Sequence, residues 1–115
     1  MFLHDTIKIT KEVIPMSKIF YPAIFHADKD GGFWIEFPDL PGCFTEGDTI
    51  EESMTMAEEA LELYIYTAKE DRKALSPPSY PTDVKVSGRD FVALIPYDEE
   101  KAIFDFIQQD IQEGI

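Results

Sequence analysis

The sequence predicts an α+β fold: a small, antiparallel-rich β-sheet with one long helix packed on it, in the order ββ(β)αβ, plus a C-terminal helix. Three observations support this fold class. Two short apolar runs flank a turn-forming DKDGG segment, a stripe of apolar residues recurs at helical spacing, and an FVALI run is apolar enough for a further strand. A chain of 115 residues is long enough for one hydrophobic core, so a single domain is expected.

The hairpin is the clearest local signal. Its strands are expected over KIFYPAIFHA (18–27) and FWIEF (33–37), because the glycines between them tolerate the positive φ that tight turns require. Successive side chains of a strand point to opposite faces. Phe33 and Ile35 are therefore expected in the core, and Trp34 on a partly wet face.

A third short strand and the start of the long helix are expected directly after the hairpin. GCFTEG (42–47) is short enough to be a third strand or an edge segment, and the prolines before it end the second strand. Asp48 or Thr49 can serve as the helix N-cap, since each is followed three residues later by a glutamate, the pattern of a capping box. The apolar stripe expected to face the sheet consists of Ile50, Met54, Ala57, Ala60, Leu61, Tyr64, Ile65 and Ala68.

The rest of the domain is predicted to be a linker, one more strand unit and a second helix. Residues 75–83 form a proline-rich connection that cannot continue a helix. Residues 83–96 are typical of a strand or hairpin, with FVALI as a buried central strand. The tail is expected to be an amphipathic helix with Asp98 as its N-cap.

The first fifteen residues fit this plan poorly. Pro15 precedes a natural start for the domain at Met16, so residues 1–15 are expected to be an upstream extension, with an extra edge strand as the alternative. Proteolysis distinguishes the two, because a paired strand resists cleavage. The expected division is therefore residues 1–15, a domain of residues 16–98 and a C-terminal helix of residues 99–115.

The net charge of −13 is unevenly distributed. The first 25 residues sum to +1, so the remaining ninety carry −14. Such a field repels nucleic-acid phosphates and anionic membranes and attracts basic partners, so direct nucleic-acid or membrane binding is not expected. No run approaches the roughly 20 apolar residues that span a bilayer. The N-terminus lacks the features of a secretory signal and the single cysteine cannot form an internal disulfide, so a cytoplasmic location is expected.

Candidate catalytic and metal-binding groups are sparse. Cys43 has no cationic neighbour in sequence to activate its thiol, and the two histidines are His4 and His26, so a small buried side chain is the favoured interpretation of the cysteine. No zinc spacing or phosphate-binding loop is present, and no cofactor is expected. Carboxylates near the strand turns could hold magnesium in a nuclease, but three of them occupy positions where turns and caps favour aspartate.

In this order, the segments resemble the HicB family of antitoxins. The family signature is a hairpin, then F-x-D-x-P-G-C-x-T-x-G-D-T, then an acidic helix containing E-A-L. The resemblance covers roughly residues 18–98, including the proline-rich linker and the strand after it. The matching residues are Phe37, Asp39, Pro41, Gly42, Cys43, Thr45, Gly47, Asp48, Thr49, Glu59, Ala60 and Leu61.

The resemblance implies a partial ribonuclease-H-like fold and a non-enzymatic role: binding HicA, a small basic mRNA-cleaving toxin, and blocking it. An acidic surface suits such a partner. The alternatives are a stand-alone HicB-like homo-oligomeric module with another partner, and a metal-dependent nuclease. The residues expected to contact the partner are Asp39, Glu46, Asp48, Glu51, Glu52, Glu58 and Glu62.

Many members of the family carry a C-terminal DNA-binding domain. Here the residues after Asp98 suffice for one helix, and acids outnumber their single lysine, whereas a DNA-reading element would need the opposite charge. Promoter binding is therefore not expected of this chain. Either the chain is a stand-alone member or its DNA-binding part lies outside this sequence.

Overall fold

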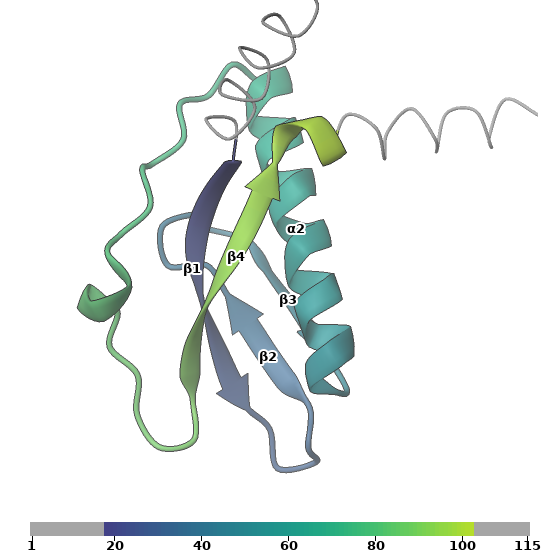
Figure 1. Cartoon of the computed structure of the whole chain (residues 1–115), viewed down its shortest axis with the longest axis vertical. Helices are drawn as coiled ribbons and strands as arrows, with labels where there is room; N and C mark the ends of the chain where they lie inside the picture. Colours follow the sequence, from purple (N-terminus) through teal and green to yellow (C-terminus); the bar gives the residue numbers. More distant parts are fainter. Residues whose placement is uncertain (1–17, 103–115) are drawn as a thin grey trace, which may run out of the picture. The chain divides into compact units, whose positions relative to one another are not determined.

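The computed structural model describes residues 18–102, which contain a four-stranded sheet and one long helix (Figure 1). The strands are β1 (Lys18–Ala27), β2 (Phe33–Glu36), β3 (Phe44–Gly47) and β4 (Phe91–Asp98), and the helix is α2 (Ile50–Glu70). A short 3-10 turn, η2 (Pro81–Asp83), lies in the linker before β4. The α+β fold class predicted from the sequence is confirmed.

The chain divides into two units, one of residues 20–96 and one formed by the two ends of the chain. In the described part of the second unit, Asp98 Oδ1 accepts hydrogen bonds from the backbone N–H groups of Glu100 (3.0 Å) and Lys101 (3.2 Å). Asp98 therefore caps the helical turn at residues 99–102, as the sequence predicts. The proposed extension or edge strand at residues 1–15, and the rest of the C-terminal helix, lie outside the described residues.

The sheet has the strand order β3-β2-β1-β4. β1 and β2 form the predicted hairpin with Phe25 opposite Ile35, and β3 returns antiparallel to β2 with Ile35 opposite Thr45. Figure 1 shows β4 beside β1, running in the opposite direction. Gly31, in the turn of the hairpin, has a φ of 93°, a conformation that residues with a Cβ rarely adopt.

The prediction of a strand or hairpin over residues 83–96 is confirmed for the strand at FVALI and wrong in two respects. Residues 84–90 form no strand, and β4 is an edge strand of the described sheet and not a central one. Its apolar sequence has a different cause: one face packs into the core, with Ile95 fully buried and the Phe91 ring stacked on Phe25 at 5.0 Å, while Leu94 on the other face is 45% exposed. One buried face is enough to require an apolar strand.

One side of α2 packs against the sheet. The prediction of a sheet-facing stripe is right in its centre and wrong at its start, because Ile50 is 44% exposed and Ser53 takes the buried position in the first turns. The buried residues of the helix are Ser53, Ala57, Leu61, Ile65 and Ala68. They meet the core face of the sheet, whose buried members include Tyr21, Ala23, Phe25 and Ile35.

The start of α2 lies against the end of β3. A Cβ added to Gly47 would lie 2.5 Å from Ser53 Oγ, 2.7 Å from Ser53 Cα and 2.8 Å from Ser53 N, all closer than side chains pack. Only glycine therefore lets the helix approach the strand this closely. This contact identifies the sheet face that α2 covers, since Gly47 and Ile35 lie on the same face in the strand register.

Candidate functional site

Acidic residues at the start of α2 stabilise the first turn of the helix. Thr49 is the N-cap: its Oγ1 accepts a hydrogen bond of 3.0 Å from the backbone N–H of Glu52. In return, Glu52 Oε1 accepts a hydrogen bond of 2.6 Å from the backbone N–H of Asp48. Glu51 adds a second carboxylate in the first turn, where negative charge is favourable to the helix dipole. Of the two N-cap candidates, the structure selects Thr49.

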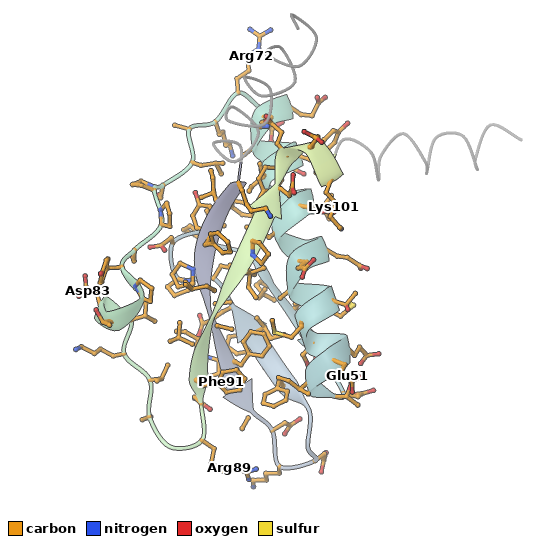
Figure 2. The ribbon with its side chains drawn as sticks, in the orientation of Figure 1. Glu51, Arg72, Asp83, Arg89, Phe91 and Lys101 are labelled. Atoms are coloured by element: carbon orange, nitrogen blue, oxygen red, sulfur yellow. The ribbon has the colours of Figure 1, made fainter. Side chains whose placement is uncertain are left out.

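Three predicted contact residues share one side of α2. Glu51, Glu58 and Glu62 are seven and four residues apart, so each lies nearly above the one before it on a helix of 3.6 residues per turn. Glu51 is exposed at the start of the helix (Figure 2), and Glu58 and Glu62 are half-buried. These three carboxylates lie along one line of the helix surface, with a turn that has no carboxylate on this line between Glu51 and Glu58, and we call them the α2 acidic stripe.

Asp39 lies apart from that stripe and fixes the linker. Its Oδ2 accepts a hydrogen bond of 2.8 Å from the backbone N–H of Ser79, and its Oδ1 accepts one from the Ser79 hydroxyl. Tyr21 supports the same connection, because its hydroxyl donates to the carbonyl of Ser76 at 2.6 Å. Burial, followed by the charge of Asp39, raises the pKa of Tyr21 above its ordinary value. Both acceptor oxygens of Asp39 are therefore engaged within the chain.

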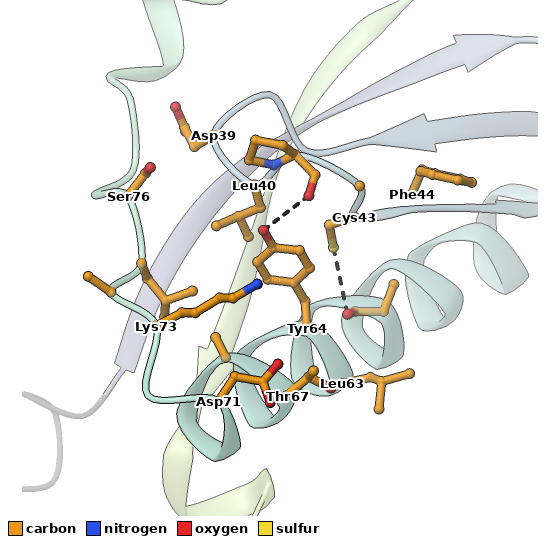
Figure 3. Close-up of a pocket in the computed structure, with 16 residues that line it drawn as sticks. Asp39, Leu40, Cys43, Phe44, Leu63, Tyr64, Thr67, Asp71, Lys73 and Ser76 are labelled. Carbon is orange, nitrogen blue, oxygen red and sulfur yellow. Dashed lines mark hydrogen bonds between the residues drawn. The ribbon is translucent and has the colours of Figure 1, made fainter.

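A pocket of about 540 Å³ opens beside Asp39, between the loop after β2, the last turns of α2 and the start of the linker (Figure 3). Apolar side chains such as Leu40 and Leu63 line it together with the polar ends of Tyr64 and Lys73. The Tyr64 hydroxyl donates a hydrogen bond of 3.1 Å to the carbonyl of Pro41, which ties the helix to the loop. Each residue of a helix is rotated by about 100° from the one before it, so Leu63 and Tyr64, which line the pocket, point away from the direction of Glu62. The pocket and the α2 acidic stripe therefore lie on different sides of α2.

Cys43 has the structural role that the sequence predicts. Its side chain is buried, and Sγ donates to the carbonyl of Ala60 at 3.7 Å (Figure 3). Burial raises the pKa of the Cys43 thiol to about 11. A thiol that remains protonated at neutral pH is a poor nucleophile, so Cys43 is not suited to covalent catalysis.

A polar cluster that the sequence analysis missed lies on the other side of the sheet. His26 Nδ1 is 2.7 Å from Asp90 Oδ2, and His26 Nε2 is 2.6 Å from Glu36 Oε2. Asp90 Oδ1 also accepts a hydrogen bond of 2.9 Å from the backbone N–H of Ala27. The Trp34 ring covers the histidine, with ring centroids 4.9 Å apart. We call His26, Glu36 and Asp90 the carboxylate–histidine cluster.

The cluster stabilises the charged forms of His26 and Asp90. Burial alone would lower the pKa of His26, but the hydrogen bonds to Glu36 and Asp90, and the charges of those carboxylates, raise it above its ordinary value. The pKa of Asp90 is held below its ordinary value, first by the N–H of Ala27 and then by His26. An imidazolium that donates from both nitrogens fits this geometry. Both ring nitrogens therefore already have carboxylate partners within the chain.

The hairpin register could have identified part of this cluster. It places His26 opposite Trp34, and the next pair on that face contains Glu36. No local signal could have identified Asp90, which lies 64 residues after His26. Glu46, the remaining predicted contact residue, is opposite Trp34 on β3. The seven predicted residues therefore occupy separate places: the helix start, the α2 acidic stripe, the loop after β2 and this side of the sheet.

Two kinds of site are absent from residues 18–102. No group of histidine, cysteine and acidic side chains there is arranged to hold a metal ion. None of the helices in that range has the length and apolar character needed to cross a bilayer.

Comparison with known proteins shows the family of the chain. Residues 21–96 match the family model described as HicB_like antitoxin of bacterial toxin-antitoxin system. Among curated proteins, Antitoxin HicB 2 of Photorhabdus laumondii is 42% identical over 60 residues, which cover 51% of this chain and 42% of that protein. An uncharacterized 14.9 kDa protein from the rep-hol intergenic region of Haemophilus phage HP1 is 35% identical over 78 residues, 65% of this chain and 57% of the phage protein.

Solved structures show the same fold. A toxin-antitoxin complex from Streptococcus pneumoniae contains a chain that aligns with a TM-score of 0.65 at 22% identity, covering 73% of this chain and 71% of that one. The HicA3 and HicB3 toxin-antitoxin complex aligns with a TM-score of 0.56 at 27% identity, covering 66% of this chain and 94% of that one. The family match spans most of the sheet, the whole of α2 and the linker. The chain therefore belongs to the HicB-like antitoxin family of bacterial toxin–antitoxin systems.

Proposed function

We propose that this chain is an antitoxin that binds a small, basic, HicA-type mRNA-cleaving toxin and blocks it without chemistry of its own. The observation that carries the proposal is the family match over residues 21–96. The aligned complex of HicA3 with HicB3 supports the kind of partner, because that structure pairs a related chain with a toxin. Blocking requires binding and no bond cleavage, which is consistent with the buried, protonated thiol of Cys43. A reducing cytoplasm is the compartment we propose for this function.

Charge supports a basic partner. The chain carries −13, and a ribonuclease that holds RNA phosphates must present a positive surface. Opposite charges of this kind accelerate association and select against acidic competitors. We propose the α2 acidic stripe, with Asp48 beside its N-terminal end, as part of the contact, and Glu46 as a contributor on the opposite face of the sheet. Asp39 and Glu52 already accept hydrogen bonds within the chain, so their contribution is the charge they add to the field.

Co-expression with the small basic protein encoded beside this chain tests the proposal. The expected results are a complex that survives purification, suppression of RNA cleavage by the toxin, and a dissociation constant that rises with salt, because surface charge pairs are screened. Combined Glu51→Gln and Glu58→Gln substitutions should weaken binding. The matched control combines Asp83→Asn with Glu70→Gln, which removes the same charge elsewhere. A neighbour that forms no complex, or keeps its full cleavage activity in the complex, would refute the proposal.

Self-association is a second candidate property. Within residues 18–102, β3 and β4 have no sheet partner on their outer sides, and such edges can pair with another copy. The short edge strand β3 presents Phe44, which is 61% exposed. A homo-oligomer formed through β3 should dissociate when Glu46→Pro removes an N–H that points away from β2, because the ladder bonds to β2 alternate along the strand and are made by Thr45. Light scattering measures the molecular mass of the wild-type chain and of the proline variant in solution. A monomeric wild-type chain would refute self-association.

A further inference from the structure

The face of the sheet opposite α2 carries two rows of paired side chains. The register aligns Ile24, Glu36 and Phe44 across three strands, and His26, Trp34 and Glu46 in the next row. Alternation along each strand places all six opposite the core residues Phe25 and Ile35. We call these six residues the open face.

Aromatic surface on the open face is unusually exposed. Trp34 is 44% exposed and Phe44 61%, and their ring centroids are 6.4 Å apart, so the two rings form one continuous surface. Leu94 of β4, 45% exposed, alternates with core residues and points to the same side of the sheet. Neighbouring exposed apolar groups of this size are typical of interaction sites.

The same face is acidic. Glu36 and Asp90 hold the His26 ring against Trp34, and Glu46 lies opposite Trp34 on β3. Lys29, in the hairpin turn, is the one lysine or arginine between residues 19 and 68, a stretch that contains eleven acidic residues. In the part of the chain that the structure describes, the aromatic surface is thus bordered by carboxylates.

We propose that the open face is the docking surface for an arginine-bearing segment of a basic partner protein, with the guanidinium group stacked on Trp34 and paired with Glu46. A guanidinium suits this surface because it stacks on aromatic faces, is weakly hydrated and binds carboxylates through two parallel hydrogen bonds. A second copy of this chain suits it poorly, since pairing would bring the Glu36 and Glu46 carboxylates of both copies into one interface with no lysine or arginine from this face to neutralise them. Phosphate-bearing nucleic acids and membranes are repelled by the same carboxylates.

This inference deepens the proposed function and takes the basic character of the partner from it. It differs in placing the apolar centre of the contact on the sheet. In protein interfaces a few aromatic and arginine residues at the centre dominate affinity, whereas exposed charges at the rim mainly influence association rates. The α2 acidic stripe belongs to the helix on the other face of the sheet, so it would add long-range attraction for the toxin, and Trp34 would hold it.

The first experiment needs no toxin. Trp34 is the only tryptophan in the chain, so its fluorescence reports directly on the open face. Acetylated tetra-arginine amide, titrated at low ionic strength, should change the emission of Trp34 saturably. The tetra-citrulline peptide, which has the same shape but no charge, should not. Glu46→Gln should weaken the arginine response by about threefold or more, the range for one exposed carboxylate and cation.

Asp83→Asn is the matched control, since it also removes one negative charge. Asp83 lies in η2 on the linker and its side chain points away from the strands (Figure 2). This variant should bind the arginine peptide like the wild-type chain. An equal response to the citrulline peptide, or equal weakening by Glu46→Gln and Asp83→Asn, would overturn the inference.

The second experiment uses the toxin complex of the proposed function. Trp34→Ala should weaken the complex by about tenfold or more, as expected for a central aromatic residue, while Trp34→Phe should retain more of the affinity. Circular dichroism verifies that both variants are folded. Unchanged binding by a folded Trp34→Ala chain refutes the inference and leaves the antitoxin proposal standing. If the wild-type chain binds no toxin, the antitoxin proposal fails and the peptide titration alone decides the role of the open face.

Discussion

Ser53→Ala should stabilise the protein although it removes a polar group. Ser53 is fully buried, and its Oγ has no hydrogen-bond partner within the described residues. A buried hydroxyl without a partner costs roughly 1–3 kcal/mol, and alanine is a better helix former than serine by about 0.5 kcal/mol. Loss of the contacts of Oγ offsets part of this gain. We expect the free energy of unfolding to rise by about 1–2 kcal/mol, and the melting temperature by about 5–10 °C.

Urea denaturation followed by Trp34 fluorescence measures the effect, and the dependence of free energy on urea should keep the same slope. Thr55→Ala is the control on the same helix. Thr55 is exposed and donates to the Glu51 carbonyl at 3.3 Å, so its replacement changes helix propensity without relieving a buried group. Its effect should be within about 0.5 kcal/mol. If Ser53→Ala destabilises the chain, Oγ has a hydrogen-bonding partner in solution and the reasoning is wrong.

Three further predictions follow from single contacts. Gly47→Ala should lower the free energy of unfolding by about 1–3 kcal/mol, and should still do so in a Ser53→Ala background, because the added Cβ also meets Ser53 Cα and N; a neutral effect would refute this contact. The pKa of His26 is raised in the fold, so its protonated form stabilises the chain below pH of about 6.5, and this contribution is lost as pH rises through the raised value. The wild-type chain should therefore lose stability relative to His26→Gln between about pH 5.5 and 8. Unfolding free energies from urea that change equally with pH in the two chains would contradict this. Burial raises the pKa of the Cys43 thiol to about 11, so at about pH 8 Cys43 should react with iodoacetamide at least about 100-fold more slowly in the folded chain than in the urea-unfolded chain. Comparable rates would show that the thiol is accessible in the fold.

Local patterns predicted the elements of this fold well. The DKDGG turn, the helical spacing of Ala57, Leu61 and Ile65, and the cap at Thr49 each depend on residues close together in the sequence, and the structure confirms all three. The errors concern contacts between distant segments. Ser53 lies four residues before Ala57, in line with the buried Leu61 and Ile65, but a stripe defined by apolar residues passes over its hydroxyl. It is buried where Gly47 lets the helix approach β3.

For the candidate site, the sequence predicted the sign of its charge but not which residues form it. A surplus of carboxylates predicts a basic partner, but it does not say which carboxylates are engaged within the chain. Asp39 is held by Ser79, forty residues later, and Asp90 completes the cluster around His26 from β4's N-terminal side. Pairings over such distances depend on the folded topology, which one sequence without relatives does not reveal.

Several of the family motif residues have structural roles in the fold. Asp39 fixes the linker, Gly42 has a φ of 87°, Cys43 fills the core, Gly47 admits the helix and Thr49 caps it. Side chains engaged in this way can change little without loss of the fold, so they are poorly placed to distinguish one toxin from another.

We therefore expect specificity for a partner to depend on positions between or beside the motif residues. Trp34, Phe44 and Glu46 are such positions: their side chains are exposed, and they lie on strands that the motif holds in register. Exchange of these three residues for those of a related antitoxin should therefore transfer toxin preference, whereas exchange of motif residues should alter stability alone. Transfer of preference by motif residues would show that the side chains used to build the fold also select the partner.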